Sequence, residues 1–431
     1  MLLRFSLQNM FSFRDRQVLD LIPCSDCTHR EVENVLEVSG ERALASIAVY
    51  GANASGKSNL FFALRSFLYS AVYSFDEMYQ GKMRPMLPFF HDEAYVSKPM
   101  SGEIEFLVKG RGYKYGYDIL GSKIKKEWLF RKDDGVYHVL FLRQTLGVKD
   151  VIDVRKENFP GVNDLIVGST RDSALFLSTC AKMSVSEAKD ILDELHDNIN
   201  VVSAEGTHSA YTADQMYKHP DFYSSVSQFL AETDPSLGKI LIAPKYEASG
   251  KFTPSGHSIL SGGYTVNVVP RDAPMDFETQ GGIPFGIVAS SGTKKAFDLA
   301  GPVFEALKFG KTLFVDEFGM VMHPILTREI LRLFNSPKTN PKKAQLIFNT
   351  HDTNLLNAKV YSPERKVREP LLRPDQIYFI ERGSDHVSRM YSKADYAPTP
   401  NDQGMTDEDE YLEGRYGAIP YIGSLLEGGR S

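Results

Sequence analysis

The stretch Ala45–Leu64 reads ASIAVYGANASGKSNLFFAL, which is an apolar run, a loop bounded by glycines and a second apolar run. Residues 47–49 predict a short buried strand, and residues 60–68 predict an amphipathic helix. Between them, Gly51 to Ser58 fits the pattern G-x-x-x-x-G-K-[ST]. Glycines let such a loop curl so that its N–H groups point inward, and the helix N-terminus adds partial positive charge. The segment therefore predicts a site for the phosphates of a nucleoside triphosphate.

The side chains of this loop have separate expected roles. Lys57 is expected to reach the β- and γ-phosphates, and the Ser58 hydroxyl is expected to bind Mg²⁺. ATP and Mg²⁺ are therefore the expected cofactors. A chance Gly/Ser turn is the alternative, and the complete motif between a strand and a helix argues against it. The residues expected to contact the nucleotide here are Gly51, Asn53, Ser55, Gly56, Lys57, Ser58 and Asn59.

Composition limits the classes of protein that the chain could form. With 431 residues, of which 42% are hydrophobic, the chain can bury a large core in two or three lobes. The net charge of −6 argues against a surface wholly dedicated to nucleic acid, and the basic run within residues 123–132 reads better as a solvated strand edge. No long uncharged apolar stretch and no signal-peptide layout are present, which predicts no membrane segment. Three cysteines favour a reducing cytoplasm, and Cys24 and Cys27 read as plain thiols.

The hydrophobic pattern divides the chain into three parts. Residues 1–157 contain an N-terminal hairpin, the phosphate loop and a β-rich stretch with turn signals at Gly110–Gly112 and Asp133–Gly135. Residues 158–239 have helical spacing and are expected to be a helical insertion. Residues 240–431 begin with irregular strands around a Gly/Ser/Pro-rich loop and continue as an α/β half with a mostly parallel sheet.

Two further strands end in polar residues. KTLFVDEF, residues 311–318, ends in Asp316, expected to hold Mg²⁺ through water, and Glu317, expected to orient or deprotonate the attacking water. AQLIFNTHD, residues 344–352, brings His351 to the end of another strand, where it could contact the γ-phosphate. Such residues can also cap helices or serve only structural roles, but behind a phosphate loop the functional interpretation is favoured. The expected catalytic residues are Lys57, Glu317 and His351, and the expected metal ligands are Ser58 and Asp316.

A Ser/Gly turn at Ala289–Thr293 opens a helix and predicts a second anion site. It lies too close to Asp316 in the sequence to bend round to its own phosphate loop. Ser290, Gly292 and Thr293 are therefore expected to reach nucleotide bound by another subunit, so that ATP joins two copies of the chain.

In this order, the phosphate loop, the S-x-G-T turn, the hydrophobic strand ending in Asp-Glu and the strand ending in Thr-His-Asp resemble the motifs of ABC-type ATPase heads. The chain is most similar to RecF/SMC-like heads, and among them to abortive-infection-type AAA ATPases of bacterial defence loci. The segments that carry the resemblance are FSLQNMFSFRD, YGANASGKSNL, FVDEFGMVMHP, LIFNTHDTNLL and YLEGRYGAIP.

This resemblance implies an α/β ABC-ATPase head with a mixed central sheet, an N-terminal antiparallel β-lobe and a short helical insertion. It implies that Ser290, Gly292 and Thr293 stand in for the ABC signature. Gly319-Met320-Val321 departs from the acidic or small polar residues common in relatives. The Q-loop falls at Pro88–Asp92 at best, and the insertion is too short for a coiled-coil arm.

The leading functional hypothesis is an ATP-hydrolysing switch of a bacterial anti-phage system, acting as a homodimer or larger homo-oligomer. The resemblance implies a separately encoded effector, a Toprim- or RloB-like nuclease or toxin, with DNA or a phage protein left open as the trigger. The alternatives are a RecF-like DNA-maintenance ATPase that clamps DNA and an effector that carries its own nuclease. The tail Gly414–Pro420 reads either as a docking segment or as part of the domain core, and the acidic run Asp407–Glu410 reads as a solvated loop.

Overall fold

The phosphate-loop strand lies inside a six-stranded sheet with the order β11-β15-β16-β5-β19-β20. The first five strands are parallel, and β20 is antiparallel to β19. Every residue of β5 and β16 is buried, as expected where a parallel sheet is covered on both faces. The strands are β5 (Ser46–Tyr50), β11 (Ile199–Val202), β15 (Thr312–Val315), β16 (Gln345–Asn349), β19 (Ile377–Arg382) and β20 (Ser388–Ser392).

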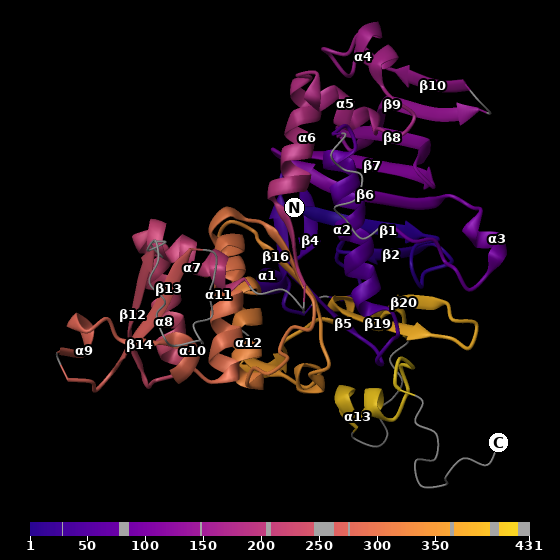
Figure 1. Ribbon diagram of the computed structural model, residues 1–431. Coiled ribbons are helices and arrows are strands. Elements are labelled where there is room, and N and C mark those ends of the chain that lie inside the picture. The colour runs from indigo at the N-terminus through magenta and orange to yellow at the C-terminus, as the bar shows by residue number, and fades with distance from the viewer. Residues whose placement is uncertain are drawn as a thin grey trace.

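The computed structural model describes residues 1–27, 29–76, 86–146, 149–203, 208–244, 263–274, 276–362, 366–396 and 405–420. Its largest sheet has seven antiparallel strands in the order β10-β9-β8-β7-β6-β1-β2 and forms the upper lobe in Figure 1. The expected hairpin turns join β6 to β7 and β8 to β9. These strands are β1 (Leu2–Gln8), β2 (Gln17–Asp20), β6 (Met100–Val108), β7 (Arg111–Leu120), β8 (Lys123–Asp133), β9 (Val136–Leu146) and β10 (Lys149–Val154).

Helix α2 (Lys57–Tyr73) follows the phosphate loop and packs on both sheets. Its Phe67 stacks on Tyr117 of the antiparallel sheet at 4.7 Å between ring centroids. Six residues earlier on the helix, Phe61 meets Phe314 of β15 edge-on at 5.4 Å. The helix that begins at the loop is therefore fixed by aromatic contacts to both lobes.

The segment expected as a helical insertion contains α4 (Asp164–Ser169), α5 (Phe176–Lys182), α6 (Ser186–Asp197), α7 (Ser209–Lys218) and α8 (Pro220–Thr233). The structure differs in one respect, because β11 lies between α6 and α7 and forms the edge of the central sheet. Helices α5 and α6 join the core of the antiparallel lobe, whereas α7 and α8 pack on α11 (Ser291–Phe309). A four-residue apolar strand cannot be told from a helical turn by periodicity, which is why the sequence pattern did not reveal it. The three domain boundaries stay predictions.

The lower left lobe in Figure 1 combines these helices with a three-stranded sheet in the order β12-β13-β14. The expected Gly/Ser/Pro-rich loop between β12 and β13 lies mostly outside the described residues. The elements of this lobe not yet named are β12 (Leu237–Pro244), β13 (Tyr264–Pro270), α9 (Asp276–Thr279), β14 (Ile283–Pro284) and α10 (Phe285–Val288).

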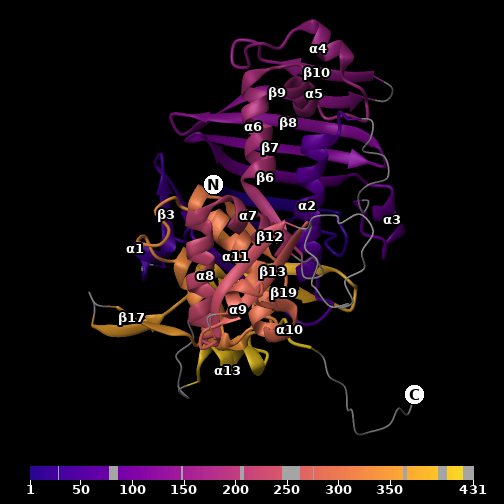
Figure 2. The same ribbon diagram turned by 60° about the vertical axis from the view of Figure 1, so that its left-hand side comes forward.

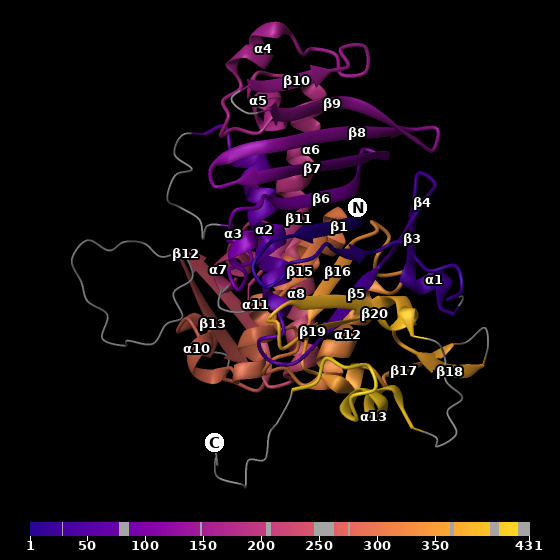
Figure 3. The same cartoon turned by 90° about the vertical axis from the view of Figure 1, so that its right-hand side faces the viewer.

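The remaining elements surround the central sheet. Two of them form a hairpin, β17 (Lys359–Ser362) with β18 (Val367–Pro370), which projects from the molecule (Figure 2) and lies near α12 (Figure 3). The others are α1 (Glu31–Asn34), β3 (Val35–Val38), β4 (Glu41–Leu44), α3 (Glu93–Val96), α12 (Pro324–Phe334), η2 (Thr353–Leu355), η3 (Pro374–Gln376), η4 (Lys393–Asp395) and α13 (Asp407–Leu412). The mixed central sheet, antiparallel lobe and helical segment confirm the expected fold class.

The C-terminal segment corrects one expectation and decides another. The acidic run Asp407–Glu410 is helix α13 and not a loop, because Thr406 caps its N-terminus and Glu410 is buried. Tyr416 and Ala418 of the following GRYGAIP segment are buried in the core beside Phe379 of β19. This segment therefore packs in the domain's own core.

Candidate nucleotide-binding site

Three neighbouring parallel strands carry the three predicted motifs. Strand β5 pairs with β16 in parallel, and β16 pairs with β15 in the same direction. The carboxyl ends of parallel strands meet at one edge of a sheet, where α/β proteins bind ligands. The phosphate loop, the pair Asp316–Glu317 and His351 therefore lie at the same edge.

Two positions of the loop require glycine, because neighbouring atoms lie too close to leave room for a Cβ. Gly56 has φ 114°, and a Cβ there would lie 2.5 Å from the Ser388 hydroxyl and 2.7 Å from the Ser12 hydroxyl. A Cβ on Gly51 would collide with the backbone carbonyl of Ile380 in β19. The N-terminal hairpin and the C-terminal strands thus press on the loop from both sides and hold its curvature.

Lys57 spans the loop that it follows. Its Nζ donates hydrogen bonds to the carbonyls of Gly51 and Ala52, at 2.7 and 2.9 Å. Burial lowers the pKa of the Lys57 ammonium to about 8, although the carboxylates of Asp316 and Glu317 act in the opposite direction. A buried cation with few partners is well placed to be stabilised by phosphate charge.

Ser58 and Asp316 meet across the sheet edge. The Ser58 hydroxyl donates to Asp316 Oδ1 at 3.0 Å, which joins residues 258 positions apart in the chain. A hydroxyl beside a buried carboxylate offers the oxygen ligands that Mg²⁺ prefers. The two residues expected to bind the metal are therefore together.

Asn349, at the end of β16, holds both acidic residues of the pair. Its side-chain amide donates to Asp316 Oδ1, and its side-chain oxygen accepts the Glu317 N–H at 2.7 Å. Glu317 has φ 55°, a backbone conformation that is uncommon for a non-glycine residue and that often occurs at functional sites. Sequence reasoning missed Asn349, although its place two residues before His351 in a strand-end motif was a usable signal.

His351 is only partly covered by protein at the same edge, and Lys57 is near enough to affect its pKa. Partial burial and the Lys57 ammonium lower the pKa of the His351 imidazole below its ordinary value. Just after it, the Asp352 carbonyl accepts the Tyr50 hydroxyl at 3.2 Å. The histidine segment is thereby tied to the residue that precedes the phosphate loop.

The other expected nucleotide-binding residues of the loop differ in their exposure and in their hydrogen-bond partners. Asn53 is exposed, and Asn59 donates to the Ser12 hydroxyl at 2.9 Å, which directs it toward the N-terminal hairpin. The Ser55 hydroxyl is buried and has no hydrogen-bond partner within the described protein. This orphaned hydroxyl, the inward-curled loop and the Ser58–Asp316 pair fit a nucleotide with magnesium.

A cluster that sequence reasoning missed lies against the outer side of the loop. Arg382 donates to the Ala54 carbonyl at 3.4 Å, and its guanidinium lies 3.1 Å from His91 Nε2. His91 in turn stacks on His386 at 4.4 Å. The stretch Pro88–Asp92, expected to hold the Q-loop, therefore lies beside the phosphate loop. The sequence carried no signal for Arg382, whose contact depends on the β19–β20 hairpin.

The turn expected to act on a neighbouring subunit caps helix α11. Ser290 accepts the Thr293 N–H at 3.1 Å, and the Thr293 hydroxyl donates to Asp234 at 3.0 Å. Thr293 is buried, which makes it a capping residue here, whereas Ser290 and Ser291 are exposed. Among the described residues, no hydrogen bond or ion pair joins this turn to its own phosphate loop.

The residues around this turn form an exposed apolar surface. A Cβ on Gly292 would lie 3.1 Å from the Val321 carbonyl, so the turn touches the segment that follows Glu317. The large apolar side chains of this surface are exposed by 41% to 61% and are Ile287, Val288, Met320 and Val321. Exposed apolar groups beside a candidate site are typical of an interface.

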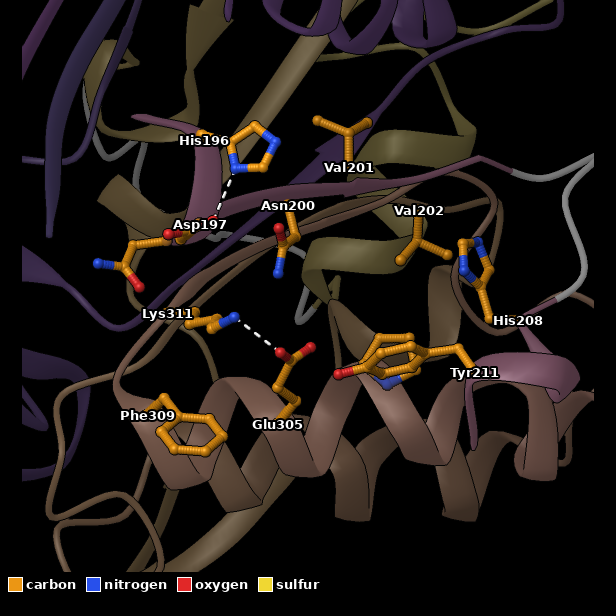
Figure 4. A pocket seen from close by; sticks show the side chains of 12 residues that line it. His196, Asp197, Asn200, Val201, Val202, His208, Tyr211, Glu305, Phe309 and Lys311 are labelled. Carbon is orange, nitrogen blue, oxygen red and sulfur yellow. Dashed lines mark hydrogen bonds and ion pairs between the residues drawn. The ribbon is translucent and has the colours of Figure 1, made fainter. Parts of the chain in front are cut away.

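A separate hollow of about 830 Å³ lies along the free edge of β11, between that strand and helices α7 and α11 (Figure 4). Its walls carry an ion pair between Lys311 and Glu305 at 2.7 Å and a contact between His196 and Asp197. None of the predicted nucleotide-site residues lines it. The volume of this hollow therefore does not mark the candidate nucleotide site.

The fold is the α/β head with an antiparallel lobe that the sequence predicts, and its motifs lie together at one edge of the central sheet. A family model described as "AAA domain, putative AbiEii toxin, Type IV TA system" matches residues 46–148 and 274–357, which include all the motifs above except Arg382 and His386 of the neighbouring cluster. No curated protein matches the chain.

A solved structure, "Crystal structure of the SmcHead bound to the C-winged helix domain of ScpA", is similar with a TM-score of 0.45 and 14% sequence identity. The match covers 91% of this chain and 97% of that chain. In the described part of the chain, no helix has both the length and the apolar character needed to cross a bilayer.

Proposed function

We propose that this protein is an ATP-binding and ATP-hydrolysing switch of a bacterial anti-phage system of the abortive-infection type. The observation that carries the proposal is the convergence of Lys57, Ser58, Asp316, Glu317 and His351 at the ends of three adjacent parallel strands. Three motifs from distant parts of the chain thus bring the side chains of a nucleotide site to one edge of the sheet, which a purely structural role would not require.

In this proposal each side chain has one task. Lys57 and the loop N–H groups bind the β- and γ-phosphates, and Ser58 and Asp316 hold Mg²⁺. Mg²⁺ held there would supply positive charge beside the phosphate oxygens during phosphoryl transfer. Glu317 accepts a proton from the attacking water, and Asn349 fixes its backbone while it does so. Partial burial, and after it the positive charge of Lys57, lower the pKa of the His351 imidazole and favour its neutral form, which can serve as a hydrogen-bonding partner of the γ-phosphate.

The switch acts as a homodimer, or a larger homo-oligomer, with ATP between subunits. The exposed turn at Ser290–Gly292 and the apolar surface around it support this assembly, because both face away from the core. ATP would close the interface and hydrolysis would loosen it, which gives two states that a partner can distinguish. We propose a separately encoded Toprim- or RloB-like nuclease or toxin as that partner; the description of the matching family as part of a toxin–antitoxin system supports a system of two components.

The catalytic part of the proposal is tested by Glu317→Gln. Turnover should fall by about 10² or more, since a positioned base is lost, while ATP binding is retained. Lys57→Ala should instead weaken ATP binding, because a charge partner of the phosphates is removed. Glu232→Gln on the exposed face of α8 is the matched control and should hydrolyse ATP like the parent. Parental turnover in the Glu317→Gln protein would show that the base is elsewhere.

The biological part is tested by co-expressing the chain with the product of the neighbouring gene. Phage infection should arrest growth only when both proteins are present, and Glu317→Gln should change that response. The alternative, a RecF-like ATPase of DNA maintenance, predicts sensitivity to DNA damage on deletion and no effect on phage growth.

A further inference from the structure

A basic groove lies between helix α12 and the β17–β18 hairpin. On the hairpin, Tyr361 pairs directly with Arg368 across the two strands, and Lys359 is two residues before Tyr361. Side chains two apart on a strand, and cross-strand partners, share one face. Lys359, Tyr361 and Arg368 therefore share a face of the hairpin, and all three are exposed.

The opposite wall of the groove is a row of arginines on α12. Arg328 and Arg332 are four residues apart, so they lie on one side of the helix. Two adjoining hollows, of about 410 and 320 Å³, are each lined by Arg328, Lys359 and Arg368. Residues from α12 and from the hairpin thus converge on the same space. We call this region the α12–hairpin groove.

The positive charge of this groove is largely uncompensated. Arg332 pairs with Glu329 at 2.8 Å, and Arg328 lies 3.9 Å from the same carboxylate. Lys359 and Arg368 form no ion pair with any residue that the structure describes. Among the residues that the structure describes, the only ion pairs of these four cations are therefore those with Glu329, in a protein whose net charge is −6. Like charges brought together in this way repel unless an anion is bound.

The basic run on β8 shows the opposite arrangement. There Lys123 pairs with Asp172, Arg131 with Asp133 and Glu187, and Lys132 with Glu41. The expectation of a strand edge is wrong, because β8 lies between β7 and β9 in the sheet, but three cations of this run are paired with carboxylates, unlike Lys359 and Arg368 of the α12–hairpin groove. The groove could not be predicted from the sequence, because its cations are spread from residue 328 to residue 368.

We propose that the α12–hairpin groove binds the phosphate backbone of a nucleic acid strand. Three arginines and a lysine around two adjoining hollows suit successive phosphates, because the guanidinium fork matches phosphate oxygens. The exposed ring of Tyr361, 60% accessible among these cations, provides a surface on which a base can stack. Stacking on an aromatic ring favours a nucleic acid over an acidic peptide.

The groove also adjoins the candidate nucleotide site. Pro324 and Ile325 line its larger hollow and begin the helix that follows Glu317 and Val321. Asn354 and Leu355 line the same hollow and follow His351 in the chain. A strand bound there would touch the segments after both of these site residues, which is a direct route for a nucleic acid to influence ATP turnover.

The test is fluorescence anisotropy of the full-length protein with a labelled single-stranded oligonucleotide of about 20 nucleotides, together with the same sequence as a duplex. The combined variant Arg328→Ala, Lys359→Ala and Arg368→Ala should bind at least about tenfold more weakly, and its salt slope should fall by about 0.7 per cation removed. The matched control removes three charges from β8, Lys123→Ala, Lys125→Ala and Lys126→Ala, and should bind like the parent.

Two further variants keep the test independent of folding and of the ATP cycle. Tyr361→Ala should weaken binding of the single strand while leaving the melting temperature unchanged, since the ring is exposed. Lys57→Ala should bind the oligonucleotide like the parent, so a failed ATPase proposal would leave this result standing. Equal binding by the groove variant and the β8 control would overturn the proposal. Tighter binding of a labelled polyglutamate peptide than of either oligonucleotide would overturn it in favour of an acidic protein partner.

Discussion

At the scale of single residues, Asn349 connects the two acids on which the proposed hydrolysis depends. Its side chain is 1% exposed; its NH₂ group donates a hydrogen bond to Asp316, and its oxygen accepts one from the Glu317 N–H. Both acids follow β15, whereas Asn349 ends the neighbouring strand β16. The relative position of the metal ligand and the base is therefore set by one side chain from a third motif.

Replacing this residue tests that role. Asn349→Leu keeps the approximate volume but removes both hydrogen bonds, so we expect ATP turnover to fall at least about tenfold through misplacement of Glu317. Unfolding in urea should show a loss of about 1–3 kcal/mol, because the Glu317 N–H is left without its partner. Glu232→Gln, on the exposed face of α8, is again the control. Turnover that stays parental while stability falls would mean that Asn349 is only structural.

The lowered pKa of Lys57 predicts a pH dependence of ATP binding. The pKa of its ammonium is about 8 in the protein alone, and added phosphate charge would raise it, so the protonated form binds. Affinity for ATP should therefore decrease as the pH rises through about 8, and binding near pH 8.5 should take up a proton. Calorimetry in buffers of different ionisation enthalpy measures this uptake. Proton uptake that persists in Lys57→Ala would assign the effect to another group.

The residues that the sequence could predict at this scale are those of contiguous motifs. Lys57, Ser58, Asp316 and Glu317 stand in short patterns whose spacing follows from one loop or one strand, and the structure brings them together. Arg382 reaches the loop only because β19 pairs with β5, a pairing that no local pattern specifies.

At the scale of elements, the C-terminal segment is part of the support for the phosphate loop. Tyr416 stacks on Phe379 of β19 at 5.1 Å, and Tyr411 packs on both Phe379 and Tyr50, at 5.4 and 5.8 Å. Tyr50 is the last residue before Gly51. From the sequence, the acidic run was expected to be a solvated loop, and the role of the following tail was left open. The sequence could not reveal the burial of Glu410 and Tyr416, because that burial depends on packing against distant strands.

This packing predicts a stability effect for a residue far from the loop in sequence. Tyr416→Ala should lower the free energy of unfolding by about 3 kcal/mol, as for other buried aromatic residues truncated to alanine. Leu412→Ala, only a few residues away but 58% exposed, should change it by less than about 0.5 kcal/mol. Urea unfolding followed by circular dichroism compares the two. If both substitutions changed the free energy of unfolding by the same small amount, the segment would not be part of the core, and a docking role would be favoured.

At the scale of the whole molecule, the proposal places ATP between two copies of the chain. Lys57 and Ser58 lie on one side, and Glu317 and His351 lie beside them. The general fold, an α/β head with an antiparallel lobe, could be predicted from motif order and strand periodicity. The exposed apolar surface at Ile287, Val288, Met320 and Val321 could not, because it combines two segments that only the fold brings together.

A mixture of two inactive proteins tests whether a second copy completes the site. Lys57→Ala lacks the phosphate contact, and Gly292→Asp places a carboxylate in the exposed turn, where it would repel phosphate; each should be inactive alone. In an equal mixture, half of the dimers contain one of each chain, and every such dimer keeps one intact composite site. Turnover should then recover to about a quarter of the parental value. Met320→Glu in the apolar surface should reduce this recovery by weakening association. A mixture that stays inactive, although light scattering and differential tags show that mixed dimers form, would mean that Ser290–Gly292 does not act on the partner's nucleotide.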